Sequence, residues 1–354
     1  MQKVNEKTEV SRSIEREKLL KSQSRSLENE DSPEIWVTTW STGNAELKDH
    51  VLARVGFNRM GHRAAPGLYS IGSPGSDSPV FVTANYTLSF DALRSSLKDV
   101  DGYILVLDTG GVNVWCAAGE GTFGTDELAK RIAVTKLGDV VSHRRLILPQ
   151  LGAPGIDSVE VKKRSGFKVE YGPVRARDIP EFLKTGTVTS EMRLVRFDLV
   201  DRLVLIPVEI TSLALPLVVA ALVFGFLGGL FSASAVIVTV LSGIVLFPIL
   251  LPWLPTKDFS SKGFFLGLLA ALPFAVGTFL GHLGLSLWLR VAYGLTPVFL
   301  MPPVTAYLAL NFTGSTPFTS RSGVKREIFR YVPIMAGSLV LGAILYIGLI
   351  LIVS

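Results

Sequence analysis

The C-terminal part of the chain, from residue 206 onward, consists of apolar runs that are each long enough to cross a membrane. Five such runs cover residues 212–231, 236–254, 264–283, 291–312 and 331–353. A helix needs about 20 mostly apolar residues to span the hydrocarbon core of a bilayer. The sequence therefore predicts an all-α transmembrane domain of five helices over residues 211–354, preceded by a linker at 191–210.

The charges between these runs predict their orientation. Residues 206–354 hold seven Lys and Arg against three Asp and Glu, and residues 1–205 hold 28 against 27, so the net charge of +5 divides into +4 and +1. Basic residues precede the first run and follow the second and fourth, whereas the other two loops contain only Arg290. Basic loops stay in the cytoplasm. We therefore expect a multi-pass protein of the inner (cytoplasmic) membrane, with its N-terminal domain in the cytoplasm.

This charge distribution also excludes a basic nucleic-acid-binding domain as the source of the high pI, so we expect no nucleic-acid partner. Residues 1–32 are polar, and they lack the apolar core of a signal peptide, which predicts a disordered tail that is not cleaved.

Residues 33–190 have the pattern of an α/β domain. Apolar or alternating runs at 80–84, 103–107, 146–148 and 167–171 predict strands, and residues 90–97, 126–135 and 159–164 predict helices between them. Strands that alternate with helices form mostly parallel sheets, so we expect a Rossmann-like fold. Its ligands bind in loops at the carboxyl ends of strands, which directs attention to the loop after residue 107.

That loop begins the segment 108–125, DTGGVNVWCAAGEGTFGT, for which three hypotheses compete. Gly119, Gly121 and Gly124 satisfy the dinucleotide pattern G-x-G-x-x-G, but eleven residues separate them from the strand, whereas that pattern follows a strand directly. In the second hypothesis, Cys116 is a small buried apolar residue and the glycines form turns. In the third, residues 113–118 form a short helix under a flat corrinoid ring, with the Cys116 thiolate facing the cobalt.

Cysteine and histidine usage restricts the metal chemistry. Cys116 is the only cysteine, so the chain alone has no internal disulfide and binds no iron–sulfur cluster. None of the four histidines lies in the Asp-x-His-x-x-Gly motif by which many cobalamin proteins bind cobalt. If the chain binds a corrinoid, Cys116 is the remaining candidate for its lower ligand.

The segment NVWCAAGEGTFGT closely resembles the motif NVWCA(A/G)GKGTFGT of the mercury-methylation corrinoid proteins (HgcA family). The resemblance extends through VTANYTLSFDALR, ILVLDTGGVNVWCAAG, VSHRRLILPQLGAPG and KKRSGFKVEYGPVRARDIPEFL, and covers about residues 67–183. That family has a membrane tail of five helices and is related to the large subunit of the corrinoid iron–sulfur protein. The sequence departs from the motif at Glu120, where the family has lysine.

The resemblance implies a corrinoid-dependent methyltransferase that passes a methyl group from a cobalamin-type cofactor to Hg(II), forming methylmercury. Cys116 would be the catalytic residue and the lower axial ligand of cobalt. The resemblance also implies a ferredoxin-like [4Fe–4S] protein as electron donor and a methyl-donor system, folate-linked, as partners. The cofactor-binding residues that it implies are Asn113, Val114, Trp115, Cys116, Ala117, Ala118, Gly119, Gly121 and Thr122.

Two other functions fit the sequence. One is a membrane-anchored corrinoid methyl carrier that acts in another methyl-transfer pathway. The other is a small permease with a cytoplasmic regulatory domain. Corrinoid binding separates the permease from the other two functions, and methyl loss that depends on Hg(II) separates the methyltransferase from the carrier.

Overall fold

The computed structural model describes residues 33–58 and 61–353, so the tail expected at 1–32 lies outside the described residues. The chain forms two compact units, which we treat separately. The first is an α/β unit made of the described residues of Met1–Ala45 and Met60–Arg193. The second is a helical unit made of Glu46–Arg59 and Leu194–Ser354, again within the described residues.

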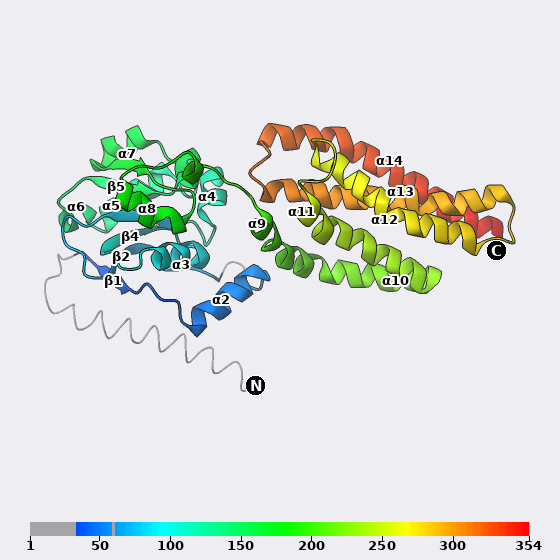
Figure 1. Ribbon diagram of the computed structural model, residues 1–354, viewed down its shortest axis with the longest axis horizontal. Coiled ribbons are helices and arrows are strands. Elements are labelled where there is room, and N and C mark those ends of the chain that lie inside the picture. The colour runs from blue at the N-terminus through cyan, green and yellow to red at the C-terminus, as the bar shows by residue number, and fades with distance from the viewer. Residues whose placement is uncertain (1–32, 59–60, 354) are drawn as a thin grey trace. The chain divides into compact units, whose positions relative to one another are not determined.

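A six-stranded sheet forms the centre of the α/β unit, in the order β1-β2-β4-β3-β5-β6 (Figure 1). All neighbouring strands are parallel except β2 and β4, which are antiparallel. The strands are β1 (Ile35–Thr38), β2 (Gly67–Ile71), β3 (Val80–Ala84), β4 (Gly102–Leu107), β5 (Arg145–Leu148) and β6 (Lys168–Tyr171). The helices are α3 (Thr87–Ser96), α4 (Val114–Glu120), α5 (Thr125–Val134), α6 (Leu137–Val140), α7 (Ser158–Ser165) and α8 (Ile179–Thr185), and the main 3₁₀ turn is η1 (Gln150–Gly155).

The sheet separates two apolar cores. Successive side chains of a strand point to opposite faces, so Val80, Val82 and Ala84 pack with α4, α5 and α7, whereas Phe81 packs with α3 and α8. All five side chains of β3 are buried. A central strand covered on both faces needs a continuous apolar run, and this is why β3 is visible in the sequence.

The order of the strands creates a switch point between β3 and β5. The chain leaves β3, forms α3 on one face and returns as β4 on one side of β3. It then leaves β4, forms α4 and α5 on the opposite face and returns as β5 on the other side of β3. Open α/β sheets bind ligands in the crevice outside the carboxyl ends of the strands at such a point.

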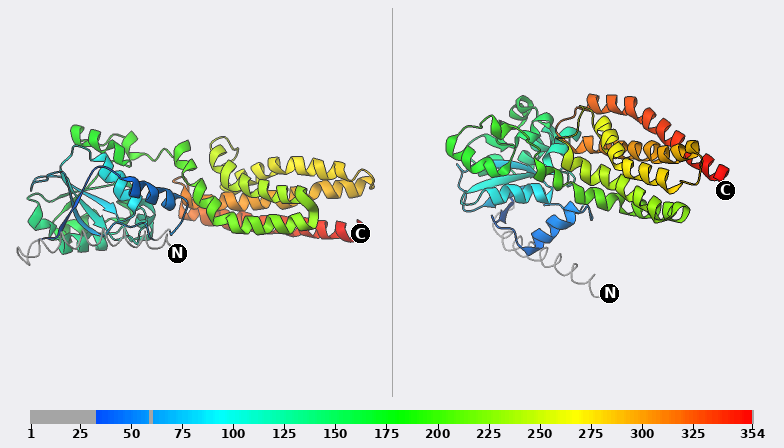
Figure 2. Two further views of the ribbon diagram at one scale, coloured as in Figure 1. Left: turned by 90° about the horizontal axis from the view of Figure 1, so that it is seen from below. Right: turned by 45° about the vertical axis from the view of Figure 1, so that its right-hand side comes forward.

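The helical unit contains four helices that are long and apolar enough to cross a membrane, not five separate ones. In Figures 1 and 2, α12, α13 and α14 run side by side. The helices of this unit are α2 (Asn44–Arg54), α9 (Leu199–Leu203), α10 (Ile206–Leu241), the π-helical turn η4 (Ser242–Leu246), α11 (Phe247–Leu250), α12 (Phe259–Gly281), α13 (Leu287–Asn311) and α14 (Arg321–Val353), with the 3₁₀ turn η5 (Phe312–Ser315) after α13.

The count differs because the first two expected spans lie in one 52-residue helical segment, Leu199–Leu250. Its backbone leaves the helical region at Gly228 (φ −139°) and Gly229 (φ 71°). Arg202 Nη1 donates hydrogen bonds to the carbonyls of Pro248 and Ile249, both at 2.8 Å. A straight helix would separate these residues by about 70 Å, at 1.5 Å per residue. The segment therefore reverses at the glycine pair and forms a hairpin of two arms.

Candidate functional site

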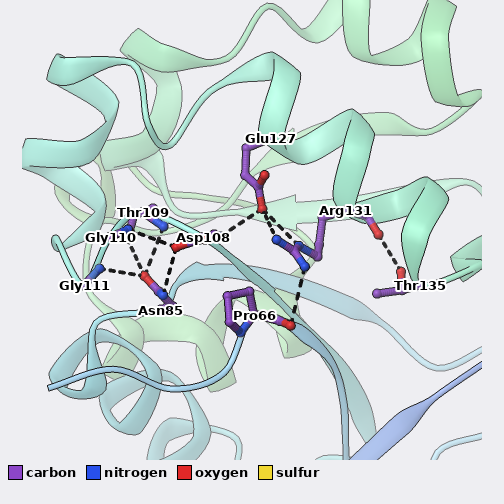
Figure 3. A network of polar contacts seen from close by, with 9 residues as sticks. All are labelled: Pro66, Asn85, Asp108, Thr109, Gly110, Gly111, Glu127, Arg131 and Thr135. Atoms are coloured by element: carbon purple, nitrogen blue, oxygen red, sulfur yellow. Dashed lines mark hydrogen bonds and ion pairs between the residues drawn. The ribbon is translucent and has the colours of Figure 1, made fainter. Parts of the chain in front are cut away.

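The loop after β4 is held by a buried asparagine at the end of β3. Asn85 Oδ1 accepts hydrogen bonds from Thr109 N (3.0 Å), the Thr109 hydroxyl (2.9 Å) and Gly111 N (2.9 Å) (Figure 3). Its Nδ2 donates to Asp108 Oδ1 at 3.2 Å. Gly110 and Gly111 both have positive φ, a conformation that glycine adopts without steric cost. The Asn85 amide thus fixes the tight loop that carries the chain from β4 to α4.

A second contact ties the same loop to α5. Glu127 Oε1 accepts a hydrogen bond from Asp108 N at 2.9 Å and pairs with the guanidinium of Arg131, whose Nη2 lies 2.5 Å away (Figure 3). Arg131 and Glu127 are one helical turn apart, and their side chains are only 12% and 15% exposed. Partial burial strengthens such a pair relative to one in water. The loop is therefore anchored both by Asn85, at the end of the neighbouring strand β3, and by Glu127 on α5.

Helix α4 is short, and both of its ends are capped. The Asn113 side chain accepts a hydrogen bond from Cys116 N at 3.0 Å, and Gly121 ends the helix with a φ of 91°. Such caps satisfy backbone groups that a two-turn helix leaves unpaired. Ala117 is buried, while Cys116 is half-buried. The Cys116 backbone is therefore fixed, and its side chain is not fully buried.

The turn η1 packs against α4, and the two backbones approach each other closely. A side chain added at Gly155 would lie 2.2 Å from the carbonyl oxygen of Phe123 and 3.1 Å from Ala118 Cα, and one added at Gly152 would meet the Phe123 ring at 2.5 Å. The Phe123 side chain is fully buried between these elements. Gly152 and Gly155 thus allow α4 and the residues after it to pack closely on η1. This close packing accounts for the two glycines of the segment LPQLGAPG.

A cavity of about 350 Å³ opens where α4 begins. This volume is at the lower end of the range for small-molecule pockets, about 300–1,000 Å³. Thr83 and Leu148, at the carboxyl ends of β3 and β5, contribute to its wall, which places it at the switch point of the sheet. Other lining residues come from α3, from α4 with its N-cap and from the loop after β6, among them Ser89, Leu93, Asn113, Val114, Trp115, Gly172 and Val174.

The structure separates the expected cofactor-binding residues into three groups. Asn113, Val114 and Trp115 line the cavity. Cys116 follows them on the same helix, and Ala117 and Ala118 are buried in the core between α4 and the sheet. The remaining three, Gly119, Gly121 and Thr122, are exposed at the far end of the helix.

The three glycines of the G-x-G-x-x-G pattern do not form a turn between strand and helix. Gly119 lies inside α4, Gly121 ends that helix, and Gly124 is the N-cap of α5. Their geometry therefore does not match a dinucleotide loop, in which the first glycine follows the strand.

The metal-binding groups of the site are suited to a metal ion that is already coordinated by a macrocycle. The described residues contain no group of three or more His, Cys, Asp or Glu that could hold a bare metal ion. Cys116 instead offers a single soft sulfur donor and is half-buried. Because a corrinoid ring supplies the equatorial ligands of its cobalt, one donor of this kind would be sufficient.

Reasoning from the sequence did not identify Asn85, Glu127 and Arg131 as part of this site. A polar residue directly after a buried apolar strand was the available signal for Asn85, and the i, i+4 spacing of Glu127 and Arg131 was the signal for the ion pair. Neither pattern shows that these side chains contact the loop after β4, because that loop is distant from them in the sequence.

Comparison with known proteins finds similarity over part of this chain. Residues 58–183 match the family model described as the CO dehydrogenase/acetyl-CoA synthase delta subunit. The gamma subunit of the acetyl-CoA decarbonylase/synthase complex of Methanopyrus kandleri is 36% identical over 129 residues, which are 36% of this chain and 28% of the relative. The gamma subunit from Archaeoglobus fulgidus is 35% identical over 128 residues, which are 36% of this chain and 27% of that subunit.

The large subunit of the corrinoid/iron–sulfur protein of Moorella thermoacetica is 28% identical over 126 residues, which are 35% of this chain and 28% of that subunit. The chain thus spans less than a third of the length of these curated relatives. The matched region contains the sheet strands β2–β6, the network around Asn85, and α4 with its cavity. The α/β unit is therefore similar to subunits of complexes of acetyl-CoA metabolism and to a named corrinoid protein.

Proposed function

We propose that this protein is a membrane-anchored corrinoid protein that transfers a methyl group from its cofactor to Hg(II), forming methylmercury. The observation that carries the proposal is the half-buried Cys116 on a short, doubly capped helix whose first residues line a cavity at the switch point of the sheet. The similarity of the α/β unit to a corrinoid/iron–sulfur protein supports the cofactor. The motif around Cys116 supports mercury as the methyl acceptor.

Each residue of the site would have a separate role in binding the cofactor. Cys116 Sγ would bind cobalt from below, and Asn113, Val114 and Trp115 would contact the cofactor where it enters the cavity. When bound, the corrinoid supplies the methyl group and a metal that changes its oxidation state. Ala117 and Ala118 are small and buried, so the backbone of α4 packs closely on the core. This packing fixes the distance of Cys116 from the core. The Cys116 thiolate would donate charge to the metal, and this would favour release of the methyl group toward an electrophile such as Hg(II).

Partners follow from the chemistry that the chain lacks. Returning the cofactor to its reduced form takes electrons, and one cysteine cannot bind the cluster that would deliver them. We therefore propose a ferredoxin-like [4Fe–4S] protein as electron donor and a folate-linked methyl-donor system. The relatives are named as subunits of complexes, which supports docking of partner proteins on the α/β unit.

We place the protein in the inner (cytoplasmic) membrane, with the α/β unit on the cytoplasmic side. The four long apolar helices support the membrane location. Orientation rests on the basic residues, because Arg202, the α11–α12 loop and the start of α14 meet at one end of the helical unit. This end carries most of the positive charge of the unit, as the positive-inside rule requires for a cytoplasmic face.

A second function, a corrinoid methyl carrier in another pathway, is favoured by the names of the relatives, which refer to acetyl-CoA metabolism. Such a carrier would hold the same cofactor in the same way. It would pass its methyl group to a protein partner and would not lose it when Hg(II) alone is added.

The test uses the full chain loaded with methylated cofactor, with and without Cys116→Ala. We expect the variant to fold, because losing one sulfur is a modest large-to-small change, and to form methylmercury only at the background rate. Its oxidised cofactor should also change its absorption spectrum. Val134→Ala, a truncation at an exposed position of α5, is the control and should change neither readout. A wild-type spectrum with normal methylmercury formation in Cys116→Ala would refute the thiolate mechanism.

A further inference from the structure

A second cavity, of about 330 Å³, lies at one end of the helical unit and is lined by four basic side chains. These are Arg196, Arg202, Lys257 and Lys262. No acidic residue is among the described residues that line it; the others are apolar, Phe197, Leu251, Pro252, Phe259 and Phe318. A concave site with only positive charges and apolar walls is suited to an anion that carries an apolar body.

Two of the four cations are fixed by backbone carbonyls. Arg202 is only 5% exposed, and its Nε and Nη1 donate to the carbonyls of Asp198, Pro248 and Ile249. These bonds use three of its five N–H donors, which leaves those of Nη2 without a partner among the residues that the structure describes. Lys262 Nζ donates to the Leu251 carbonyl at 3.0 Å. Both side chains are held in place without a carboxylate.

Asp258 and Glu327, two carboxylates near this end, are engaged elsewhere. Asp258 accepts a hydrogen bond from the Tyr331 hydroxyl at 2.9 Å. Glu327 is buried on α14 and accepts hydrogen bonds from Phe259 N, Ser260 N and the Ser260 hydroxyl at the start of α12. They join α14 to the start of α12, and neither carboxylate lines the cavity.

The aromatic residues around the cavity indicate its depth in a membrane. Trp253, in the loop that follows α11, is 70% exposed, and Phe318, at the rim of the cavity, is 62% exposed. Exposed aromatic side chains at the ends of apolar helices lie at the headgroup level of a bilayer. At the opposite end of α13, Arg290 lies over the Phe279 ring at 4.2 Å from its centroid. In the described residues of the helical unit, the cations Arg196, Arg202, Lys257 and Lys262 thus gather at one end, whereas Arg290 lies at the other.

We infer that this cavity binds the phosphate of an anionic phospholipid, with the two exposed cations, Arg196 and Lys257, and the two fixed ones, Arg202 and Lys262, around the headgroup. Basic pockets between transmembrane helices on the cytoplasmic side bind such headgroups. The inference rests on the membrane location in the proposed function, but it does not depend on methyl transfer or on the cofactor.

The test measures lipid retention by the full chain in detergent, by native mass spectrometry. The probe is an equimolar mixture of phosphatidylglycerol and phosphatidylcholine, and a parallel sample receives inorganic phosphate alone. We expect preferential retention of phosphatidylglycerol. Retention should weaken roughly fivefold for each basic residue removed, first in Lys257→Gln and further in Lys257→Gln/Lys262→Gln. Arg290→Gln removes a cation from the opposite end and should leave retention unchanged.

Several results would overturn the inference. Equal retention of the two lipids, or unchanged retention in both lysine variants, would show that the cavity does not select an anionic headgroup. Binding of inorganic phosphate without any preference for phosphatidylglycerol would assign the site to a free anion. Because Lys257 is exposed, its variant tests the site even if the double variant does not fold. A chain that stays in solution without detergent or lipid would refute the membrane location itself, which is a distinguishable failure.

Discussion

The two units of this protein position their elements by different means. In the α/β unit, alternating apolar side chains fill two cores, and a buried polar side chain, Asn85, decides where the critical loop lies. In the helical unit, most of the surface of each helix is apolar, and small residues decide the packing. Side chains added at Gly263 and Gly267 would lie 2.6 Å from backbone atoms of Ala306 and Pro302 on α13.

The difference fits the membrane location that we propose for the helical unit. In water, burial of apolar surface drives folding, so a few polar contacts are enough to select one loop conformation. In lipid, apolar burial gives no preference for a neighbouring helix over a lipid tail, and close backbone approach through small residues takes its place. The informative residues are therefore the buried polar ones in the first unit and the glycines in the second.

The largest effect on stability is expected for Asn85→Ala. This change leaves the N–H groups of Thr109 and Gly111 buried without an acceptor, and each such group costs about 1–3 kcal/mol. We expect the free energy of unfolding of the α/β unit to fall by about 3 kcal/mol and the amides of residues 109 and 111 to exchange faster with solvent. Asn311→Ala, at an exposed position at the end of α13, is the matched control. Unchanged exchange at these amides would show that Asn85 does not hold the loop.

A smaller effect is expected for Gly267→Ala in the helical unit. The new methyl group would have to displace the α13 backbone, and such overpacking costs about 1–3 kcal/mol. Gly337→Ala on α14 makes the same chemical change where nothing lies within 4 Å of the added atom, so it should not destabilise the helix. Thermal unfolding of both variants in the same detergent measures the difference. Equal stability of the two variants would mean that α12 and α13 do not depend on close approach.

The smallest effect is expected for Glu120→Lys, which restores the residue of the motif. Glu120 is exposed on the last turn of α4. A single exposed charge contributes no more than about 1 kcal/mol, so titration with corrinoid should show less than about a fivefold change in affinity. Glu181→Lys reverses a charge at an exposed position of α8 and serves as the control. A change of tenfold or more that is specific to residue 120 would place this turn in contact with the cofactor or a partner.

Much of the α/β fold was predictable from the sequence. The strand expected at 80–84 is β3 with the same bounds, and β4 and β5 each begin one residue earlier than expected. Strands β3 and β4 are visible because both of their faces are buried, and β5 is visible by its buried pair Leu146 and Leu148. By contrast, β1 and β2 were not predicted, since turn residues interrupt the segment 36–78 and its strands are stabilised by distant partners.

The site and the helical unit were predictable in part. The short helix at 113–118 corresponds to α4, Val114–Glu120. The cavity beside it was not predictable, because it is formed by segments from Phe81 to Ile179 that come together only in the folded sheet. The five expected spans appear as four long helical segments in the described residues, because the first two spans are the two arms of one segment that reverses at Gly228 and Gly229. Hydropathy cannot distinguish such a reversal from a loop between separate helices.

In the membrane location that we propose, that reversal has a consequence for how the chain enters the bilayer. Residues 210–256 contain no charged residue, so neither the two arms nor the glycine turn between them carries a charge. A lysine at the centre of such an arm would add roughly 3 kcal/mol to the free energy of insertion, and no cost of this kind arises here. During synthesis the two arms can therefore insert together as one hairpin. Translocation of the turn then needs no separate signal, and α12–α14 are added to a pair that is already in the bilayer.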